Sequence, residues 1–221
     1  MLSTTSGYAF LDVSRSGTLV YAPGYQRGVD RSIVWVDRTG RMSPLSSSRR
    51  PYRDPALSPD GRRLAVSIEG PSNDDIWIYD LGRDAGQRLT TGGDNRFPIW
   101  SPDGKRVVFQ SNRGGALNLF QMPAAGGEAP EPLTEGHAWH VVPDSFSPDG
   151  HFMVHASNDS GRNEIYVRPF PGLSQKWQVS KEGGGGGKST APREVPGEPN
   201  DEGNDEPPEE VGEELIPDPE E

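Results

Sequence analysis

The chain has 221 residues, enough for one domain or two small ones, and its 28 glycines and 22 prolines make up over a fifth of it. That share is high for a helical protein and suits a chain of many turns. The chain has no cysteine, which excludes disulfides and thiolate chemistry, and no apolar run approaches the roughly 18 residues that a membrane-spanning helix needs, so we expect no membrane insertion.

The net charge of −11 is concentrated at the C-terminal end. Residues 1–182 carry 20 basic and 20 acidic side chains, whereas residues 183–221 carry 2 basic and 13 acidic ones. The second segment has no aromatic residue and is rich in proline and glycine, so it cannot bury enough apolar surface to offset its chain entropy. We therefore predict a disordered acidic tail over 183–221. The neutral body lacks a basic stripe, which argues against nucleic-acid binding.

The N-terminal segment gives no targeting signal. We interpret residues 1–8 as a lead-in, because "MLSTTSGYAF" has neither a basic region nor the apolar core of a secretory signal. The location is therefore left as unknown, although the sequence as it stands, without a visible signal, would fit the cytoplasm. If it is a piece of a longer protein, a periplasmic or other extracytoplasmic location stays open.

The body, residues 9–182, is a repeat. The tetrapeptide "SPDG" begins at Ser58, Ser101 and Ser147, and a weaker copy, "SRSG", begins at Ser14. The spacings of 44, 43 and 46 residues match one four-stranded propeller blade, for which about 40–45 residues is typical. We predict four units, over residues 9–45, 54–90, 97–134 and 143–180.

Each unit contains the same succession of short apolar runs. After the turn comes a run such as "RLAVSI" or "RVVFQS", then a polar loop, a run such as "DIWIYD" or "LNLFQM", and a closing segment such as "QRLT" or "EPLT". The runs are rich in β-branched and aromatic residues, and turn-forming residues bound them. No segment keeps a 3.6-residue apolar period. The sequence predicts an all-β propeller of about four four-stranded blades, with almost no helix.

The "SPDG" segments are interpreted as turns and not as catalytic sites. Proline fixes φ at the first corner, aspartate can bond to its own backbone, and glycine adopts a positive φ. A motif that returns with every blade is more typical of the fold than of a site. The residues of this structural motif are Ser58, Pro59, Asp60, Gly61, Ser101, Pro102, Asp103, Gly104, Ser147, Pro148, Asp149 and Gly150.

The third unit, "WSPDGKRVVFQSNRGGALNLFQM" followed by "PLT", resembles the blades of TolB-type β-propellers, which are relatives of WD-repeat proteins. The resemblance covers about residues 9–180. Such propellers occur in periplasmic TolB, which binds protein partners, over the catalytic domain of prolyl-oligopeptidase-like peptidases, and attached to bacterial serine/threonine kinases. The opening unit, "FLDVSRSGTLVYAPG" with "SIVWVDRTG", is most similar to the kinase-attached examples.

The number of units departs from this family. Family propellers usually have six or more blades, whereas four units are visible here. A ring that does not close exposes two sheet edges. We therefore expect an open arc, or a fragment of a larger propeller, with self-association through its open edges as one consequence.

The sequence lacks the motifs of the enzymes that carry such propellers. It has no Gly-x-Ser-x-Gly elbow of an oligopeptidase, and it has no His-Arg-Asp loop or Asp-Phe-Gly motif of a kinase. We predict no catalytic residue, no cofactor and no metal site. The expected function is non-catalytic binding of a protein or peptide. The alternative is an accessory propeller domain separated from a serine/threonine kinase or a prolyl-oligopeptidase-like peptidase.

Three other groups of residues are interpreted as packing or solvent-exposed residues and not as sites. His137, His140, His151 and His155 fall within 19 residues, but strand spacing places the last pair roughly 13 Å apart, so we expect packing and surface roles. Asp74 and Asp75, next to Asn73, are expected to be solvated loop acids. Five tryptophans mostly recur in strands, and Trp35 and Trp77 are expected at the same place in successive blades; the others are Trp100, Trp139 and Trp177.

The stretch "KEGGGGGKST" resembles a phosphate-binding loop but fails its pattern. Glu182 stands where the first glycine of the loop is required, and prolines at 192, 196 and 199 prevent the helix that should follow. Its start, "WQVSKEGGG", is instead in register with "QRLTTGGDN", the connector that leads from the second unit to the third. We interpret it as a connector to a fifth blade that does not follow in this sequence.

Overall fold

The structure is a computed structural model, and it describes residues 10–13, 19–22, 29–83, 85–136, 138–171 and 175–184. Within these ranges the chain forms sixteen β-strands and no helix, which confirms the all-β prediction. No helix in the described part of the chain is long and apolar enough to cross a membrane. The lead-in, the "SRSG" turn and the tail from residue 185 on lie outside the described residues.

The strands form four four-stranded antiparallel sheets, as predicted. Blade 1 consists of β1 (Phe10–Val13), β2 (Leu19–Ala22), β3 (Val34–Val36) and β4 (Met42–Pro44). Blade 2 consists of β5 (Tyr52–Leu57), β6 (Arg63–Ile68), β7 (Asp75–Asp80) and β8 (Ala85–Arg88). Blade 3 consists of β9 (Asn95–Trp100), β10 (Arg106–Gly114), β11 (Ala116–Pro123) and β12 (Glu131–Pro132). Blade 4 consists of β13 (Val141–Phe146), β14 (Phe152–Ser157), β15 (Glu164–Pro169) and β16 (Trp177–Gln178).

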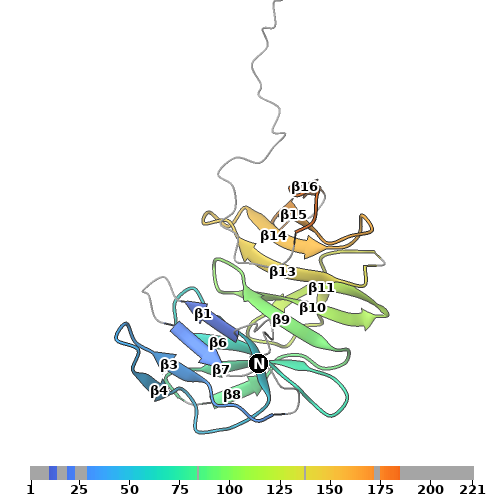
Figure 1. The fold of residues 1–221 in the computed structure, drawn as a ribbon. Helices are drawn as coiled ribbons and strands as arrows, with labels where there is room; N and C mark the ends of the chain where they lie inside the picture. The colour runs from blue at the N-terminus through green and yellow to red at the C-terminus, as the bar shows by residue number, and fades with distance from the viewer. Residues whose placement is uncertain are drawn as a thin grey trace, which may run out of the picture.

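The blades are arranged as an open arc. Figure 1 shows the four sheets following one another in chain order, from blue to orange. The first strands of neighbouring blades are in contact, β1 with β5, β5 with β9 and β9 with β13. In the described ranges, every extensive contact between blades joins consecutive blades. This agrees with the expected open arc.

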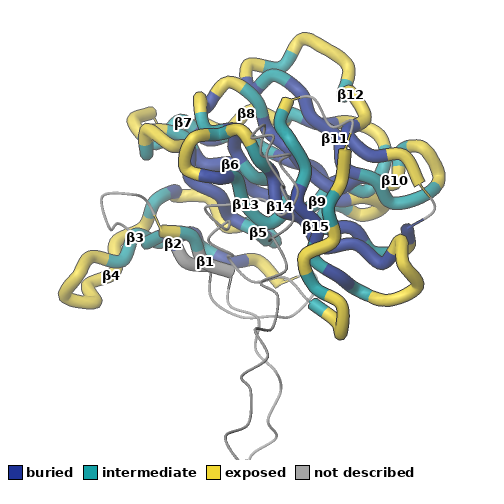
Figure 2. The backbone as a smooth tube through the Cα atoms, turned by 90° about the horizontal axis from the view of Figure 1, so that it is seen from above, coloured by how far each residue is buried: buried dark blue, intermediate teal, exposed yellow. Residues whose placement is uncertain are grey.

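The core lies between the blades, in three clusters that each combine residues of two neighbouring sheets. One lies between blades 1 and 2, with Val20, Ile33, Leu64 and Val66 at its centre. The second joins blades 2 and 3, and the third joins blades 3 and 4. Figure 2 shows the buried backbone gathered in the middle strands of the blades and the exposed backbone in the outer loops. Burying one such side chain contributes about 1.5–3 kcal/mol, so blade-to-blade packing dominates the stability of the arc.

Trp35 and Trp77 pack between blades 1 and 2, but one detail of the prediction is wrong. Trp35 pairs with Val20 and Trp77 pairs with Val66, and strand register places Val34, not Trp35, at the position of Trp77. The two rings therefore point from opposite sides into the cluster between blades 1 and 2. The pair that closes the first hairpin of blade 1, Val13 with Leu19, encloses five residues, whereas Leu57 with Leu64 in blade 2 encloses six. Because side chains alternate by single residues, matching sequence positions after this hairpin point to opposite faces in the two blades.

Two further tryptophans also contribute to blade packing. The buried Trp100 donates its indole N–H to the Ala56 carbonyl oxygen of blade 2, at 2.9 Å. The Arg63 guanidinium lies over the Trp100 ring, 4.5 Å from its centre. Trp177 in β16 contacts Phe152 edge-on, with ring centres 6.3 Å apart. Trp100 and Trp177 therefore have the packing role that was predicted for tryptophans in the strands.

Candidate functional site at the connector face

The loops of the arc lie at the two opposite ends of the strands. At one end, which we call the turn face, lie the "SPDG" turns between the first and second strands of each blade. At the other end, which we call the connector face, lie the loops between second and third strands and the connectors between blades. Because binding residues are commonly found on loops, both faces are candidate sites.

The structure places the "SPDG" residues in three equivalent turns. In the first, the Ser58 hydroxyl donates to Asp60 Oδ1 at 2.5 Å and accepts the Arg63 backbone N–H at 2.9 Å. The Gly61 N–H donates to the Ser58 carbonyl oxygen, and Gly61 has a φ of 68°. The same bonds recur around Ser101 and Ser147. The serine hydroxyl and the aspartate carboxylate of each turn are thus hydrogen-bonded within that turn.

The turn carboxylates are held in their charged form. The pKa of Asp103 is lowered because the Ser101 hydroxyl and the Lys105 backbone N–H both donate to it. Equivalent donors lower the pKa of Asp60 and of Asp149. A carboxylate that is both ionised and bonded inside its own turn is poorly suited to accept a proton from a substrate. The carboxylates of the turn face therefore have a structural role in their turns.

The connector face is organised by a clamp that recurs in three blades. In blade 2, the Thr90 hydroxyl donates to Asp75 Oδ1 at 3.0 Å and accepts the Ile76 N–H at 2.8 Å. Asn118 with Thr134 forms the same clamp in blade 3, and Glu164 with Ser180 forms it in blade 4. The prediction that Asp75 is a solvated loop acid is therefore wrong. Asp75 begins β7, is 7% exposed, and ties the third strand of its blade to the closing segment.

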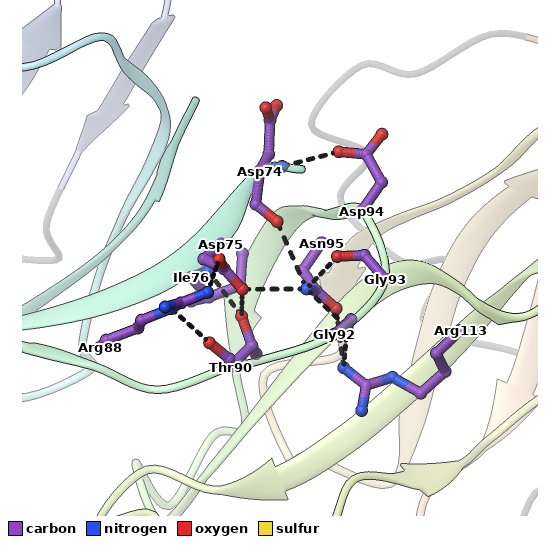
Figure 3. Close-up of polar contacts among 10 residues, drawn as sticks. All are labelled: Asp74, Asp75, Ile76, Arg88, Thr90, Gly92, Gly93, Asp94, Asn95 and Arg113. Atoms are coloured by element: carbon purple, nitrogen blue, oxygen red, sulfur yellow. Dashed lines mark hydrogen bonds and ion pairs between the residues drawn. The ribbon is translucent and has the colours of Figure 1, made fainter. Parts of the chain in front are cut away.

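Asn95 joins this clamp to the connector between blades 2 and 3 (Figure 3). Its side-chain amide, which is fully buried, donates to Asp75 Oδ1 and to the carbonyl oxygens of Asp74, Gly92 and Gly93. The Asn95 side-chain oxygen accepts a hydrogen bond from Arg113 at 2.8 Å. One side chain thus fixes the path of the connector.

Asp74 is also buried, at 3% exposed, so the solvated-loop prediction is wrong for it as well. Its carboxylate forms an ion pair with Arg96 at 2.8 Å, and Arg53 lies 3.5 Å away. Its backbone N–H donates to Asp94 at 2.9 Å. Burial raises the pKa of Asp74, and the two arginines oppose that rise. The sequence contained a signal for Asp75, because Asp75, Asn118 and Glu164 each stand 17 residues after the serine of their turn.

A hollow of about 340 Å³ opens beside this network. It is lined by the loop from Ile68 to Asn73 and by Asp75, Trp77 and Arg88. Arg88 forms an ion pair with Asp75, and its side chain is 49% exposed. The Arg50 guanidinium lies 4.6 Å from the centre of the Trp77 ring. The hollow thus combines an aromatic wall, an exposed guanidinium and loop backbone, which suits contact with a peptide side chain.

Trp139 is the most exposed of the large apolar side chains at this end. It lies in the connector between blades 3 and 4, outside any strand, and is 72% exposed, so it is not a packing residue. The neighbouring His140 is pinned to blade 4, because its N–H donates to Asn158 Oδ1 at 3.0 Å and its carbonyl oxygen accepts the Asn158 N–H at 3.1 Å. Partial burial lowers the pKa of His140. An exposed aromatic ring is therefore held on an anchored backbone.

The other histidines have separate roles. His155 is fully buried and stacks on Tyr166, with ring centres 5.6 Å apart, at the place where blade 3 stacks Phe109 on Phe120. Burial lowers the pKa of His155 to about 3, so it stays neutral. His151 is exposed in the turn before β14, so it does not share a strand with His155 as expected, and His137 lies outside the described residues. No group of three or more histidine and acidic side chains within the described ranges is placed to hold a metal ion.

Two carboxyls of the inner strands have raised pKa values. Burial raises the pKa of Asp54 and of Asp144 to about 6 each. Asp54 lies in the bulge of β5 with a φ of 49°, and Phe97 has a φ of 53° at the same place in β9. In blade 4 that place is held by Pro143. The strained backbone therefore recurs in two blades, whereas the buried acid at this position belongs to blade 2 alone.

The start of the glycine run follows the path of a blade connector. The Gly184 N–H donates to the Asn163 carbonyl oxygen at 2.9 Å, as the Asn95 N–H donates to the Asp74 carbonyl oxygen at 2.8 Å. The Gly183 N–H donates to the clamp residue Glu164 at 3.1 Å. The predicted register with the blade 2–3 connector is confirmed through Ser180, which matches Thr90, but it is wrong by one residue at Gly184, which takes the place of Asn95 and not of Asp94. Lys188 and the residues around it lie outside the described ranges.

Comparisons with known proteins agree with this architecture. Residues 25–192, about three quarters of the chain, match the family described as the TolB beta propeller domain. The uncharacterized peptidase YuxL of Bacillus subtilis is 40% identical over 110 residues, covering 46% of this chain and 16% of YuxL. The Tol-Pal system protein TolB of Alcanivorax borkumensis is 33% identical over 86 residues, covering 38% of this chain and 20% of that protein.

A solved structure assigned as TolB from Agrobacterium tumefaciens has the same fold. It superposes with a TM-score of 0.65 at 23% sequence identity, over 78% of this chain and 66% of that one. The chain spans less than a quarter of the two curated relatives named above, so the likeness concerns their propeller regions. The match over most of the chain and the four-bladed arc together identify this chain as a member of the TolB beta propeller domain family.

Proposed function

We propose that this chain is a binding module for a protein or peptide, without catalysis of its own, and that its partner docks on the connector face. The observation that carries this proposal is Trp139, 72% exposed on a connector that Asn158 anchors to blade 4. Tryptophan is enriched among the residues that dominate protein interfaces, because a large rigid ring buries much area for little lost entropy. An exposed ring on a fixed backbone is already prepared for such a contact.

The contrast between the two ends of the arc supports the choice of face. The acids of the turn face are bonded inside their own turns. The connector face combines the exposed ring with the hollow beside Trp77 and with the half-exposed Arg88. Membership of the TolB propeller family agrees with a protein partner, since TolB-like propellers are protein-interaction modules.

The test is site-specific photo-crosslinking in cells that express the full chain. A photoreactive residue is placed at Trp139, and a matched one is placed at Lys105, which is exposed in the turn face. We expect an adduct with one protein or peptide from position 139 and none from position 105. The crosslinked protein is then purified, and its affinity for the wild-type chain and for Trp139→Ala is measured by calorimetry. A loss of at least tenfold in Trp139→Ala supports the proposal, whereas an adduct from position 105 alone, no adduct at 139, or unchanged affinity rejects it.

The second candidate is an accessory propeller of a larger enzyme. One observation favours its peptidase form, the 40% identity to the peptidase YuxL over 110 residues. The finer resemblance to kinase-attached propellers stays a prediction. The genomic DNA on both sides of the gene separates the forms: a Gly-x-Ser-x-Gly elbow in a continuing or neighbouring reading frame supports the peptidase form, and a His-Arg-Asp loop supports the kinase form.

A further inference from the structure

The outer edge of blade 2 is a strand edge that no other described strand covers. β8 (Ala85–Arg88) is the last strand of its sheet and pairs with β7 on one side only. All four of its residues are exposed. Figure 1 shows β8 as the outermost strand of its sheet, at the lower rim of the arc.

Strand register identifies the backbone groups that point outward from β8. The Leu89 N–H donates to the Ile76 carbonyl oxygen at 2.8 Å. In an antiparallel pair, the backbone groups of alternate residues face the partner strand, so those of every second residue counted back from Leu89 face β7. The N–H and C=O groups of the residues between them, Gly86 and Arg88, therefore point away from β7. Within the described ranges, no strand pairs with them on that side.

The other outer strands are blocked in ways that β8 is not. β12 and β16 have two residues each, and β12 ends at Pro132. β4 has three residues and ends at Pro44, which has no N–H to donate. Short strands and prolines are common means of preventing pairing at a sheet edge. β8 has four residues and no proline, and a Cβ at Gly86 would lie 2.6 Å from the Tyr79 ring, so the backbone there has no side chain to shield it.

A strand added to β8 would place alternate side chains beside the hollow on the connector face. Arg88 and Trp77 are directly paired, so their side chains lie on one face of the sheet, and both line the hollow. Asp75 and Ile68 line it from the same face. The residue opposite Arg88 in an added strand points its side chain to this face as well.

The accessible charge beside the hollow is basic. Arg88 and Asp75 form an ion pair, in which the arginine side chain is 49% exposed and the aspartate side chain 10%. Arg50 adds a second guanidinium, stacked on the aromatic wall of the hollow. The acid Glu69 is 19% exposed and lies 3.7 Å from Arg53. This face therefore favours an acidic side chain opposite Arg88.

The charges at the other borders of β8 give no such preference. In the turn between β7 and β8, Arg83 lies 3.8 Å from Asp80, and both are exposed. On the opposite face of the sheet, Gly126 of blade 3 lies close to Gln87, and the same loop carries the exposed Glu128. The preference for an acidic side chain thus applies to the face of the hollow alone.

We propose that the β8 edge binds an extended peptide of a partner protein as a fifth, antiparallel strand of blade 2, with an acidic residue opposite Arg88. That residue exchanges two backbone hydrogen bonds with Arg88, and the residue two positions away exchanges two with Gly86. In strand addition of this kind the main chain supplies affinity and alternate side chains supply specificity. The surface is separate from Trp139, so the inference does not depend on the contact proposed there.

The β8 edge of a second copy is a less suitable occupant. It would bring Arg83 and Arg88 to an edge that already presents both, and it has no acidic residue to place opposite Arg88. Four backbone hydrogen bonds and one charge pair are few for a protein contact, so we expect a dissociation constant on the order of 0.1–1 mM.

The first test measures amide hydrogen exchange of the full chain by NMR. The probe is a capped peptide of about nine residues in which threonine and glutamate alternate, added up to about 5 mM. We expect exchange at Gly86 and Arg88 to slow at least fivefold. The Met42 N–H is the matched control, because register places it on the outer edge of β4. Unchanged exchange at Gly86 and Arg88, equal slowing at Met42, or slowing that depends on chain concentration without peptide overturns the proposal.

The second test separates backbone pairing from charge attraction. N-methylation of the glutamates removes the N–H groups that would face β8, whereas N-methylation of the threonines removes those on the other edge of the peptide. We expect the first peptide to bind at least tenfold more weakly than the unmethylated one, and the second to change by less than twofold. Equal affinities of the two methylated peptides contradict the pairing.

The third test addresses the acidic residue. We expect a peptide of alternating threonine and lysine to bind at least threefold more weakly than the glutamate peptide. This preference should disappear in Arg88→Gln and persist in Arg83→Gln, the matched control in the neighbouring turn. A lysine peptide that binds equally well, or a preference that persists in Arg88→Gln, overturns the acidic specificity. The methylated peptides decide the strand pairing in the wild type even where Arg88→Gln does not fold.

Trp139→Ala distinguishes this inference from the proposed function. It should bind the glutamate peptide as the wild type does, because the indole lies on the connector between blades 3 and 4 and not in blade 2. Equal weakening in Trp139→Ala and Arg88→Gln would mean that the peptide binds at the connector face and not along β8.

Discussion

The two faces of the arc are built on different plans. At the turn face, three copies of one tetrapeptide form the same set of hydrogen bonds, and even the lowered pKa of the aspartate recurs. At the connector face, the clamp between the third strand and the closing segment recurs in three blades, and the bond from a connector N–H to Asn112 in blade 3 recurs at Asn158 in blade 4. Asn95, the hollow beside Trp77 and the exposed Trp139 each occur once. What recurs from blade to blade serves the fold, and what occurs once is free to serve recognition.

Among the polar side chains of the two faces, the largest effect is expected at Asn95, which joins the clamp of blade 2 to the connector. Replacing it by alanine removes the amide that holds Asp75 and three carbonyl oxygens, and it leaves buried polar groups without partners. We expect Asn95→Ala to lower the free energy of unfolding by about 2–3 kcal/mol in urea titrations at pH 7. Asn73→Ala, in the exposed loop nearby, is the control and should stay within about 0.5 kcal/mol. Equal losses in the two variants would mean that the connector is not fixed by Asn95.

The second effect is an increase in the free energy of unfolding. Burial raises the pKa of Asp54 from 3.8 to about 6, so its carboxyl is harder to ionise in the folded chain than in the unfolded one. The folded state is therefore penalised above pH 6, and the penalty disappears as the pH falls below 3.8. Asp54→Asn keeps the shape and the acceptor for the Phe97 N–H. We expect it to raise the free energy of unfolding by about 1–3 kcal/mol at pH 7.5.

The control for Asp54→Asn is the same comparison at low pH. At pH 3.5 the wild-type carboxyl is protonated in the folded state and mostly protonated in the unfolded state, so the two proteins should unfold at nearly the same urea concentration. A gain that persists at pH 3.5 would assign the effect to packing and not to the charge. The result also sharpens the comparison between repeated and single residues, since Phe97 and Pro143 stand at the same place in blades 3 and 4.

The third effect tests whether the turns are equivalent. Asp103→Ala removes the acceptor for the Ser101 hydroxyl and the Lys105 N–H, and Asp60→Ala removes its counterpart in blade 2. We expect each to lower the free energy of unfolding by about 1 kcal/mol at pH 7. Because the pKa of Asp103 is lowered in the folded chain, this contribution is present above pH 3.8 and is lost as the pH falls further. Losses that differ strongly between the two variants would show that the turns do not serve one common role.

These cases show why the sequence revealed some features and not others. The "SPDG" turns and the short strands were predictable because their chemistry lies within about six residues of chain. The burial of Asp75 was missed because its partner Thr90 is 15 residues away, on the other side of β7 and β8. The faces of Trp35 and Trp77 were missed because the closing pairs of the two first hairpins enclose five and six residues, and this difference reverses the alternation of side chains. The exposure of Trp139 has no local signal at all, since it depends on which blades leave the ring uncovered.

The smallest effect on stability is expected at Trp139, and it is the one that separates recognition from folding. The ring is 72% exposed, and its connector is held by backbone bonds to Asn158 that do not involve the indole. Trp139→Ala should therefore change the free energy of unfolding by less than about 0.5 kcal/mol, while Trp100→Ala, which empties a buried position, should cost about 3 kcal/mol or more. Thermal melts of the two variants measure this difference directly. If Trp139→Ala destabilises the chain as Trp100→Ala does, the connector face needs that ring for its own packing, and the division between a repeated fold and a single recognition residue fails at this position.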